Sequence, residues 1–421
     1  MNNKRPLRIA LLTYRGHPYT GGQGVYVRHL ARELKSLGHH VTVVSGPPYP
    51  ILDEGIELVE LPSLDLYRMP DPFRFPKFSE YDDWIDVLEY AITAFATFAE
   101  PLTFSLRAAR YLKHRLDDFD LVHDNQCLGY GILQIQDMGM PVLETIHHPI
   151  TVDRRIETEH APTRWKRLTK DRFYAFTTMQ SHVAQRLPRV VTVSSNSYDD
   201  IVTGHGVDPN RLHIVHVGVD PDHFKPIPGI EPVPGRIMTT ASADVAMKGL
   251  AFLLEALAKL RVDMPEAHLT IIGRPKYDSR ATRTITELGL GDHIEFVSGV
   301  SDDRIVELYS EAQVAVVPSL YEGFSLPAIE AMSCGVPLVA STGGALPEVV
   351  GADGETAIHV EPGNTEDLVA KVGHVLRNPD LRSTIGQAGR QRVVDNYSWR
   401  ITAERTVAEY RALLDELGTR R

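Results

Sequence analysis

Two carboxylates, Glu322 and Glu330, lie in a segment whose pattern predicts a strand, a loop and a helix in succession. The apolar run Val314–Pro318 predicts the strand, and Glu322 follows it in the loop Ser319–Ser325. Glu330 lies one turn into the helix that comes next. A carboxylate accepts two hydrogen bonds at once, which suits the neighbouring hydroxyl groups of a ribose or a hexose. The pair therefore indicates a site for sugar hydroxyls.

The helix after this loop adds a place for an anion. Ser325 is the expected N-cap, Pro327 is tolerated in the first turn, and Gly335 ends the helix. A helix that starts at the carboxyl end of a parallel strand points its free N–H groups and the positive end of its dipole into the crevice. We expect a diphosphate to bind there. Taken alone, Glu330 would only balance the helix dipole, and its pairing with Glu322 favours the binding role.

Two cations come after predicted strands of the same half of the chain. Lys248 stands in Met247-Lys248-Gly249-Leu250, and Arg274 follows Gly273 at the end of the run His268–Ile272. A cation beside a departing diphosphate stabilises the charge that develops in the transition state. The alternative for each is a solvated surface side chain.

The first half contains a glycine loop, Gly21-Gly22-Gln23-Gly24, between a predicted strand and the predicted helix Val25–Leu37. Glycines let a backbone approach a phosphate or a sugar closely, although a turn can require them for geometry alone. The spacing is not G-x-G-x-x-G, so a nicotinamide cofactor is not indicated.

Three further polar residues of the first half stand at the ends of predicted strands. His147 and His148 follow the run Pro141–Ile146, and Asp124 follows Asp120–His123. An isolated histidine is usually structural, so the position at a strand end is what distinguishes these candidates.

Strand and helix patterns alternate along nearly the whole chain, which predicts two doubly wound parallel sheets. The strands expected in the first half are Leu7–Thr13, His40–Ser45, Ile56–Leu61, Asp120–His123, Pro141–Ile146 and Val190–Ser194. The second half repeats the scheme with Leu212–Val217, Arg236–Ala241, His268–Ile272, Ile294–Val297, Val314–Pro318 and Pro337–Ser341. Prolines between 221 and 234 mark a linker, so we expect domains at 1–220 and 221–399, with the helix 400–421 packing back on the first.

Two regions depart from this alternation. Residues 63–118 are too long for an ordinary connection and contain two helical stretches, Trp84–Ala99 and Leu102–Leu116. They are either extra helices that cover the first sheet or a lid that binds the acceptor. The segment Asp153–Arg172 concentrates seven Arg and Lys residues and is either a solvated face or a site for an anionic acceptor or a lipid surface.

Composition narrows the class of protein. Lys and Arg number 44 and Asp and Glu 55 in 421 residues, a net charge of −11 that argues against a general nucleic-acid binder. The two cysteines cannot form a disulfide framework or a four-thiolate zinc site. The apolar run Ile9–Leu12 is too short for a signal peptide and no run suits a spanning helix, so we expect a cytoplasmic protein.

The segment Glu322-Gly-Phe-Ser-Leu-Pro-Ala-Ile-Glu330 resembles the E-x₇-E signature of the family 4 retaining glycosyltransferases. The resemblance extends to the linker segment Val215–Pro226, to Gly335–Ser341 with the Gly343-Gly344 and Pro347-Glu348 that follow, and to Gly21-Gly22. It implies the GT-B fold, in which two doubly wound Rossmann-like domains face each other across a cleft.

The resemblance also implies roles for individual residues. Glu330 would bind the ribose, Glu322 the hydroxyls of the donor sugar, and Lys248 the diphosphate, while His147 would face the donor sugar. Further donor contacts would come from Gly22, Ser242, Val300, Gly323, Phe324, Ser325 and Leu326. Gly21, Asp124 and His148 are the acceptor-side candidates.

One family residue is missing. Family members carry an arginine five or six residues before the lysine, and this chain has Ala243 and Ser242 there. We hypothesise that Arg274 supplies the missing charge.

The expected reaction is transfer of a sugar from a nucleotide diphosphate sugar to a hydroxyl acceptor with retention. No cofactor or metal is expected, and we take the strings Asp118-Phe-Asp120 and Asp220-Pro-Asp222 as coincidental. The acceptor, a glycan, glycolipid or small molecule, stays open, as do an anionic or lipid-linked acceptor and peripheral contact with the inner membrane face. Alternative functions are a nucleotide-sugar epimerase or hydrolase, a pyridoxal-phosphate phosphorylase, and a catalytically silent nucleotide-sugar-binding protein.

Overall fold

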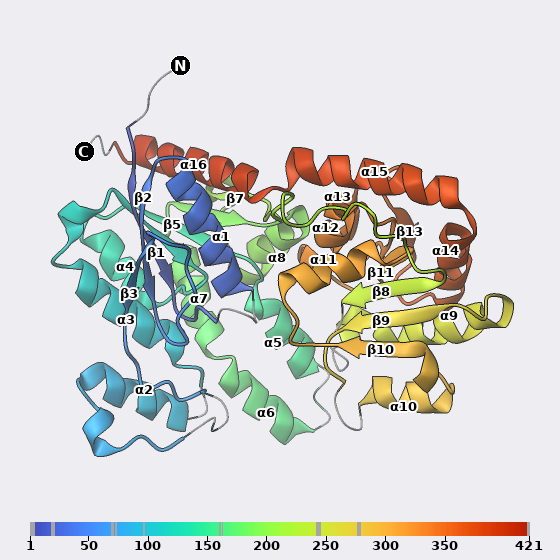
Figure 1. Ribbon diagram of the computed structural model, residues 1–421. Helices are drawn as coiled ribbons and strands as arrows, with labels where there is room; N and C mark the ends of the chain where they lie inside the picture. Colours follow the sequence, from blue (N-terminus) through green and yellow to red (C-terminus); the bar gives the residue numbers. More distant parts are fainter. Residues whose placement is uncertain are drawn as a thin grey trace. The chain divides into compact units, whose positions relative to one another are not determined.

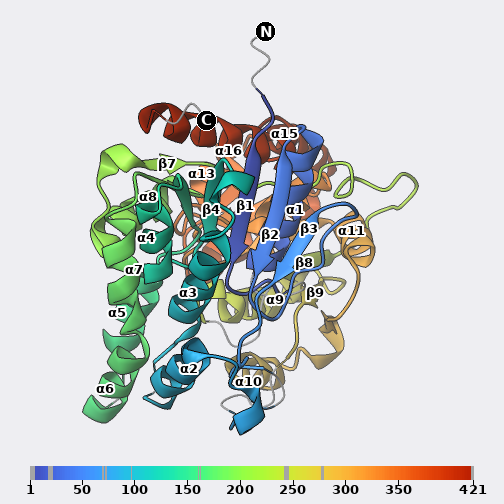
Figure 2. The same ribbon diagram turned by 90° about the vertical axis from the view of Figure 1, so that its left-hand side faces the viewer.

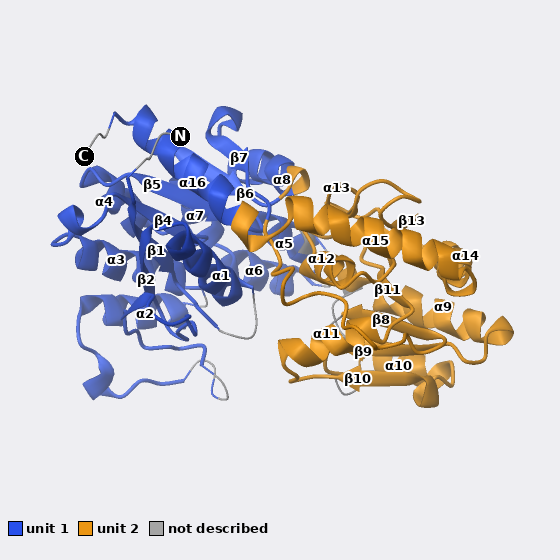
Figure 3. Cartoon of the chain, turned by 45° about the horizontal axis from the view of Figure 1, so that its top comes forward, with its two compact units in different colours: residues 1–193, 197–216, 402–421 blue, residues 194–196, 217–401 orange. Residues whose placement is uncertain are grey.

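The computed structural model divides the chain into two compact units (Figures 1 and 3). It describes residues 5–17, 22–68, 71, 74–95, 97–159, 161, 163–240, 246–275 and 279–418. Unit 1 consists of residues 1–193, 197–216 and 402–421, and unit 2 of residues 194–196 and 217–401. The division after residue 216 lies close to the boundary expected after residue 220.

Unit 1 is built on a seven-stranded sheet in the order β3-β2-β1-β4-β5-β6-β7. All paired strands are parallel. The strands are β1 (Arg8–Thr13), β2 (His40–Ser45), β3 (Glu57–Glu60), β4 (Leu121–Asn125), β5 (Val142–Ile146), β6 (Arg189–Thr192) and β7 (Leu212–Ile214). The central strands β1, β4, β5 and β6 are almost wholly buried, as expected for apolar runs with helices on both faces.

The helices of unit 1 connect these strands as crossovers. They are α1 (Gln23–Ser36), α2 (Trp84–Ala94), α3 (Glu100–Leu112), α4 (Tyr130–Asp137), α5 (Ile150–Glu159), α6 (Arg164–Phe173), α7 (Phe176–Ala184) and most of α8 (Ser195–His205). We expected the strand Leu212–Val217 to belong to the second half of the chain, and this assignment is wrong. It forms β7, which pairs with β6 and so extends the sheet of unit 1.

Unit 2 has a six-stranded parallel sheet in the order β10-β9-β8-β11-β12-β13. Its strands are β8 (Arg236–Thr240), β9 (His268–Ile272), β10 (Ile294–Val297), β11 (Val314–Val317), β12 (Leu338–Ser341) and β13 (Ile358–Val360). Its helices are α9 (Leu250–Asp263), α10 (Arg280–Glu287), α11 (Asp302–Ser310), α12 (Leu326–Ser333), α13 (Leu346–Val350), α14 (Thr365–Arg377) and α15 (Pro379–Asn396). The sequence analysis missed β13, because three residues are too few for an apolar run to stand out. Two doubly wound sheets are thus confirmed.

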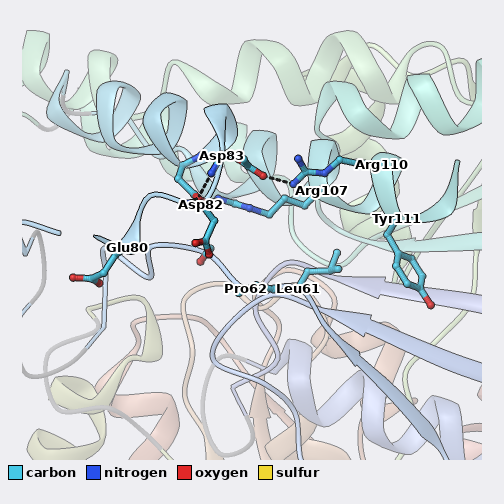
Figure 4. A pocket seen from close by; sticks show the side chains of 10 residues that line it. Leu61, Pro62, Glu80, Asp82, Asp83, Arg107, Arg110 and Tyr111 are labelled. Carbon is cyan, nitrogen blue, oxygen red and sulfur yellow. Dashed lines mark hydrogen bonds and ion pairs between the residues drawn. The ribbon is translucent and has the colours of Figure 1, made fainter. Parts of the chain in front are cut away.

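Residues 63–118 contain the two predicted helices, with bounds shorter than expected, and buried ion pairs join them. The Arg107 side chain from α3 is 6% exposed and lies 2.5 Å from Asp86 Oδ1 and 2.7 Å from Glu89 Oε2 of α2. A cavity of about 190 Å³ lies beside these pairs, and Leu61, Pro62, Arg110 and Tyr111 also line it (Figure 4). Since Arg110 is paired with Asp83, both cations that line the cavity are already engaged.

The last helix, α16 (Trp399–Glu416), packs on unit 1 from residue 402 onward. Its Tyr410 hydroxyl lies 2.6 Å from His123 Nδ1, and the His123 Nε2 lies 2.6 Å from the Thr145 hydroxyl. Arg189 of β6 forms ion pairs with Glu409 and Glu416. Side chains of β4 and β6 therefore hold the end of the chain against this sheet.

Candidate active site

An ion pair in unit 2 brings together the two residues predicted to contact the diphosphate and the donor sugar. Lys248 Nζ lies 2.8 Å from Glu322 Oε1 and 3.0 Å from Oε2. The Ser319 hydroxyl donates to Glu322 Oε1 at 2.7 Å. Glu322 is only 8% exposed, so both contacts hold its carboxylate in one place. The sequence analysis did not single out Ser319, although it stands in the loop that carries Glu322.

Backbone contacts explain why this ion pair forms. The N–H of Leu320 donates to the Met247 carbonyl at 2.7 Å, and the N–H of Ala345 donates to the Glu322 carbonyl at 2.9 Å. A Cβ on Gly249 would lie 1.9 Å from the Pro318 carbonyl oxygen, and one on Gly344 2.3 Å from that of Glu322. Glycine at these two positions therefore lets three loops close around the carboxylate.

The start of α12 differs from the expected serine cap. Ser325 occupies the N-cap position, but its φ of 89° lies in the left-handed region and its side chain caps nothing. Its Oγ is buried without a hydrogen-bond partner among the residues that the structure describes. The Phe324 ring packs edge-on against Tyr397 with 5.8 Å between ring centroids. Ser325 is thus the N-cap residue, as expected, but it lacks the side-chain hydrogen bond that a serine at this position usually makes.

Glu330 is the fifth residue of α12 and is half-buried. Burial, together with the charge of Asp302, raises the pKa of its carboxyl to about 7. Tyr309 of α11 adjoins this helix and donates from its hydroxyl to the Pro327 carbonyl at 3.3 Å. Glu330 is therefore partly protonated near neutral pH in the free protein.

The raised pKa predicts how the binding of a nucleoside diphosphate changes with pH. A diol donates hydrogen bonds to the charged carboxylate, and the Glu330 carboxyl becomes charged as the pH rises through about 7. We expect affinity for a nucleoside diphosphate to rise between pH 6 and pH 8, by up to about tenfold. Calorimetric titration at both values measures this. Glu330→Gln is the control, since it keeps the phosphate titration of the nucleotide but should lose the extra pH dependence. An equal rise in both proteins would contradict the prediction.

Arg274 and Val300 lie near each other at the carboxyl end of β9 and in the loop after β10. Arg274 is exposed, and its Nη2 lies 3.7 Å from where a Cβ on Gly299 would stand. Val300 is half-buried and Leu326, at the start of α12, is also half-buried. Ser242 and Ala243, which replace the family arginine, lie outside the described residues.

In unit 1, His147 is held at the end of β5 by the residue that ends β4. Asn125 Oδ1 lies 2.7 Å from His147 Nε2. Since the amide oxygen only accepts, Nε2 carries the proton and Nδ1 keeps its lone pair. The Tyr26 ring packs edge-on against the imidazole, with 4.4 Å between centroids. Burial lowers the pKa of His147 to about 4, so the ring is a neutral hydrogen-bond acceptor at physiological pH.

Gln126 fixes the backbone around this histidine. Its Oε1 accepts hydrogen bonds from the N–H groups of His147 (2.8 Å) and His148 (3.2 Å). Its own N–H donates to Glu144 at 3.1 Å, and its φ is 59°. Sequence analysis missed Asn125 and Gln126, although both stand directly after the Asp124 that it selected.

The acceptor-side candidates differ in exposure. Asp124 is fully buried and accepts a hydrogen bond from the Leu128 N–H at 2.9 Å. It therefore holds the loop after β4 and presents no surface to an acceptor. Burial raises the pKa of Asp124 to about 6. His148 is partly exposed and lies 3.0 Å from Asp153. Gly22 is exposed and caps α1 with a φ of 75°, while Gly21 lies outside the described residues.

Replacing Asn125 by aspartate tests whether His147 acts as the neutral acceptor. The carboxylate would still accept from Nε2, but its charge should raise the His147 pKa by about one to three units. We expect the acidic limb of the kcat/KM pH profile to move up by this amount. Asn125→Leu should lower activity up to about 100-fold at all pH values, because the ring loses its alignment. If both variants keep the wild-type profile, Asn125 does not position His147.

The Asp-x-Asp strings have structural partners. Asp120 forms ion pairs with Arg5 at 3.2 Å and Arg8 at 3.0 Å. Asp220 accepts a hydrogen bond from the Asp222 N–H at 3.1 Å within its own turn. In the part of the chain that the structure describes, no group of three or more His, Cys, Asp or Glu residues could hold a metal ion. Over the same residues, no helix is both long and apolar enough to cross a bilayer.

Comparisons with known proteins agree with this architecture. The family model "Glycosyltransferase Family 4" matches residues 20–223, and "Glycosyl transferases group 1" matches residues 230–392. The chain is 50% identical over 405 residues to the MMP α-(1→4)-mannosyltransferase of Mycolicibacterium hassiacum, covering 96% of this chain and 98% of that protein. It is 25% identical to the D-inositol 3-phosphate glycosyltransferase of Streptomyces bingchenggensis, covering 97% and 90%.

Solved structures share the fold at lower identity. Sucrose-phosphate synthase from Thermosynechococcus elongatus aligns with a TM-score of 0.73 at 23% identity, over 98% of this chain and 100% of that chain. HepE from Anabaena, solved in complex with UDP-glucose, aligns with a TM-score of 0.69 at 15% identity, over 96% and 100%. The chain therefore belongs to the family 4 retaining glycosyltransferases of the GT-B fold, enzymes that move a sugar from a nucleotide diphosphate sugar to an acceptor.

Proposed function

We propose that this enzyme transfers α-mannose from a nucleotide diphosphate mannose to the 4-hydroxyl of a methylmannose polysaccharide. The observation that carries this proposal is the 50% identity, over nearly the full length of both chains, to an MMP α-(1→4)-mannosyltransferase. The part of the proposal that concerns the nucleotide-sugar donor is supported by the geometry of unit 2, where Lys248, Glu322 and Ser319 form one hydrogen-bonded group.

In the proposed donor site, each group of unit 2 binds a different part of the nucleotide sugar. Glu330 binds the ribose diol, and Glu322 accepts hydrogen bonds from the mannose hydroxyls. The free N–H groups of Gly323 to Leu326 and the positive end of α12 bind the diphosphate. The main chain around Val300 binds the base, and Arg274 supplies the second positive charge at the diphosphate. Ser242 and Gly22 are further proposed donor contacts.

The transfer breaks two bonds and forms two. The bond between mannose C1 and the diphosphate oxygen breaks, and the acceptor oxygen bonds to C1 on the same face, which preserves the α configuration. The acceptor proton passes to the departing phosphate oxygen. The Lys248 ammonium stabilises the negative charge that grows on that oxygen. His147 accepts a hydrogen bond from a sugar hydroxyl through Nδ1, and Gly21 and His148 are the proposed acceptor-side residues.

The proposal is tested by supplying mannose on GDP, UDP, ADP and dTDP in turn, with an α-(1→4)-linked O-methylmannose oligosaccharide as acceptor. We expect one nucleotide to support transfer, with a new α-(1→4) linkage detected by NMR. Glu322→Gln is the matched control and should lose most of this activity. Transfer of another sugar in place of mannose, or consumption of the donor without a new linkage, would overturn the proposal.

Metal independence is a prediction that rests on the use of a lysine in place of a bound cation. We expect dialysis against EDTA to leave kcat within about twofold, since Lys248 and the α12 N-terminus supply the positive charge at the diphosphate. Re-addition of Mg²⁺ or Mn²⁺ serves as the control. A loss of activity that either ion restores would show that the enzyme needs a metal.

We also propose that the reaction takes place in the cytoplasm, where nucleotide sugars are made and thiols stay reduced. Cys127 and Cys334 are both buried and unpaired, which suits a reducing compartment.

A further inference from the structure

An exposed apolar surface of unit 1 has no role in the chemistry described above. The side chains of Phe95, Trp165 and Leu168 are 66%, 77% and 63% exposed. Trp165 and Leu168 belong to α6, and Phe95 follows α2. Exposed apolar groups gathered in one place mark binding surfaces more often than isolated ones do. We call these three residues, together with the aliphatic stem of Arg172, the apolar strip.

The strip is continuous because α2 and α6 meet at their carboxyl ends. The Arg172 guanidinium lies 5.8 Å from the centroid of the Phe95 ring, and the Thr97 hydroxyl donates to the Arg172 carbonyl at 3.1 Å. Trp165, Leu168 and Arg172 are spaced by three and four residues, which puts them on one face of α6. From Trp165 to Arg172 this face runs about 10 Å along the helix. Figures 1 and 2 show α2 and α6 at the same end of unit 1.

Aromatic rings connect the strip to the carboxyl edge of the sheet. The Phe98 ring lies 6.3 Å from Phe173 at the end of α6, 5.2 Å from Tyr67, and 6.2 Å from Tyr14 between ring centroids. Tyr14 directly follows β1, whose last residue pairs with Asn125. These ring contacts therefore link the edge that carries Asn125 and His147 to Phe173, the last residue of the helix that also carries Trp165.

The charges beside the strip are partly paired inside unit 1. Lys170 lies 3.0 Å from Glu157, and Arg154 lies 3.5 Å from Asp171. These contacts join the charged face of α6 to α5, and Arg172 is engaged with Phe95. Arg164, Lys166 and Arg167 of the same helix are exposed, so vesicles of anionic lipid are a necessary control for this surface.

We propose that the apolar strip binds the O-methylated mannose units of the acceptor that lie several residues from the reacting end. This inference rests on the proposed function. O-methylation replaces the hydrogen of a hydroxyl group by a methyl group. The glycan therefore gains apolar surface and loses donors that could form hydrogen bonds with carboxylates or amides. Flat aromatic and aliphatic side chains match such a surface.

The experiment compares two acceptors, an O-methylmannose disaccharide and the corresponding hexasaccharide, in wild type and in a Trp165→Ala/Leu168→Ala variant. We expect the variant to raise KM for the hexasaccharide about tenfold. The kcat and the KM for the disaccharide and for the donor should not change, because the strip lies beyond the reacting end. Trp84→Ala is the matched control, since it removes an exposed indole from α2 outside the strip. An unchanged hexasaccharide KM in the double variant would overturn the proposal.

Fluorescence separates this inference from the proposed function and from membrane docking. The emission of Trp165 is the difference between wild type and Trp165→Phe. We expect the hexasaccharide alone to shift it, and vesicles of phosphatidylglycerol to leave it unchanged. If wild type transfers no mannose to either acceptor, the proposed function fails, while a shift with the hexasaccharide still supports the strip. A shift in emission with vesicles only, or with neither probe, would overturn the proposal that the apolar strip binds the acceptor.

Discussion

Lys248→Ala is expected to lower kcat by about 10²–10³-fold, the usual loss when one preorganised charge at a leaving group is removed. The reason is the position of the ammonium, 2.8 Å from Glu322, where the proposed diphosphate and mannose meet. Because the charge on the leaving oxygen grows only in the transition state, the donor KM should change less than kcat. Single-turnover kinetics with saturating donor measures the chemical step directly.

Two variants serve as controls for this prediction. Lys248→Arg keeps the positive charge and should recover part of the lost kcat. If the loss in Lys248→Ala came from a structural defect, urea unfolding of that variant would also show reduced stability. Arg274→Ala tests the hypothesis that this arginine replaces the missing family cation, and should lower kcat by about tenfold or more. Full turnover in Arg274→Ala beside a large loss in Lys248→Ala would refute that hypothesis. A kcat within about threefold of wild type in Lys248→Ala would refute the role of Lys248 itself.

Arg107→Met is expected to reduce the free energy of unfolding of unit 1 by about 3–5 kcal/mol at pH 8, because it leaves two buried carboxylates unpaired. Asp86 and Glu89 are 8% and 1% exposed in their side chains. Arg110→Met is the matched control, since Arg110 is 52% exposed in its pair with Asp83. That variant should lose less than about 1 kcal/mol. Urea unfolding followed by circular dichroism measures both.

The same variant has a defined pH dependence. Burial raises the pKa of Glu89, and loss of the Arg107 charge should raise it further. A group with a raised pKa in the folded state contributes its stability below its unfolded pKa and loses it as the pH rises through the folded pKa. The penalty of Arg107→Met should therefore be smaller at pH 5 than at pH 8. A penalty that grows as the pH falls would show that the carboxylates are not the cause.

Much of unit 2 could be predicted from local pattern. The strand Val314–Val317, the loop with Glu322 and the helix from Leu326 are contiguous in sequence, so an apolar run, a turn and a helix start identify them. The side-chain role of Ser325 could not be predicted in this way. Its left-handed φ arises from the packing of the loop, and no composition rule favours serine in that conformation.

In unit 1 the sequence indicated the strand ends but not which contacts each side chain makes. Asp124 and Asn125 are adjacent, and alternation along the strand sends one into the interior and the other to His147. The assignment depends on the register of β4 against β5, which local pattern does not specify. Gln126 was missed for a similar reason, because its contacts with His147 and His148 span more than twenty residues of sequence.

The sequence by itself determined the parallel α/β class, the two-sheet organisation and the family, because periodicity, turn residues and the Glu322–Glu330 motif are local properties of the chain. Only the tertiary structure decided that Lys248 pairs with Glu322 across 74 positions. The same holds for the ring tautomer that Asn125 fixes in His147, and for the contact of Phe95 with Arg172 that makes two separate unusual segments one apolar strip. Such contacts depend on how strands order themselves and how helices pack, and these follow from burial of the whole core rather than from neighbours in sequence.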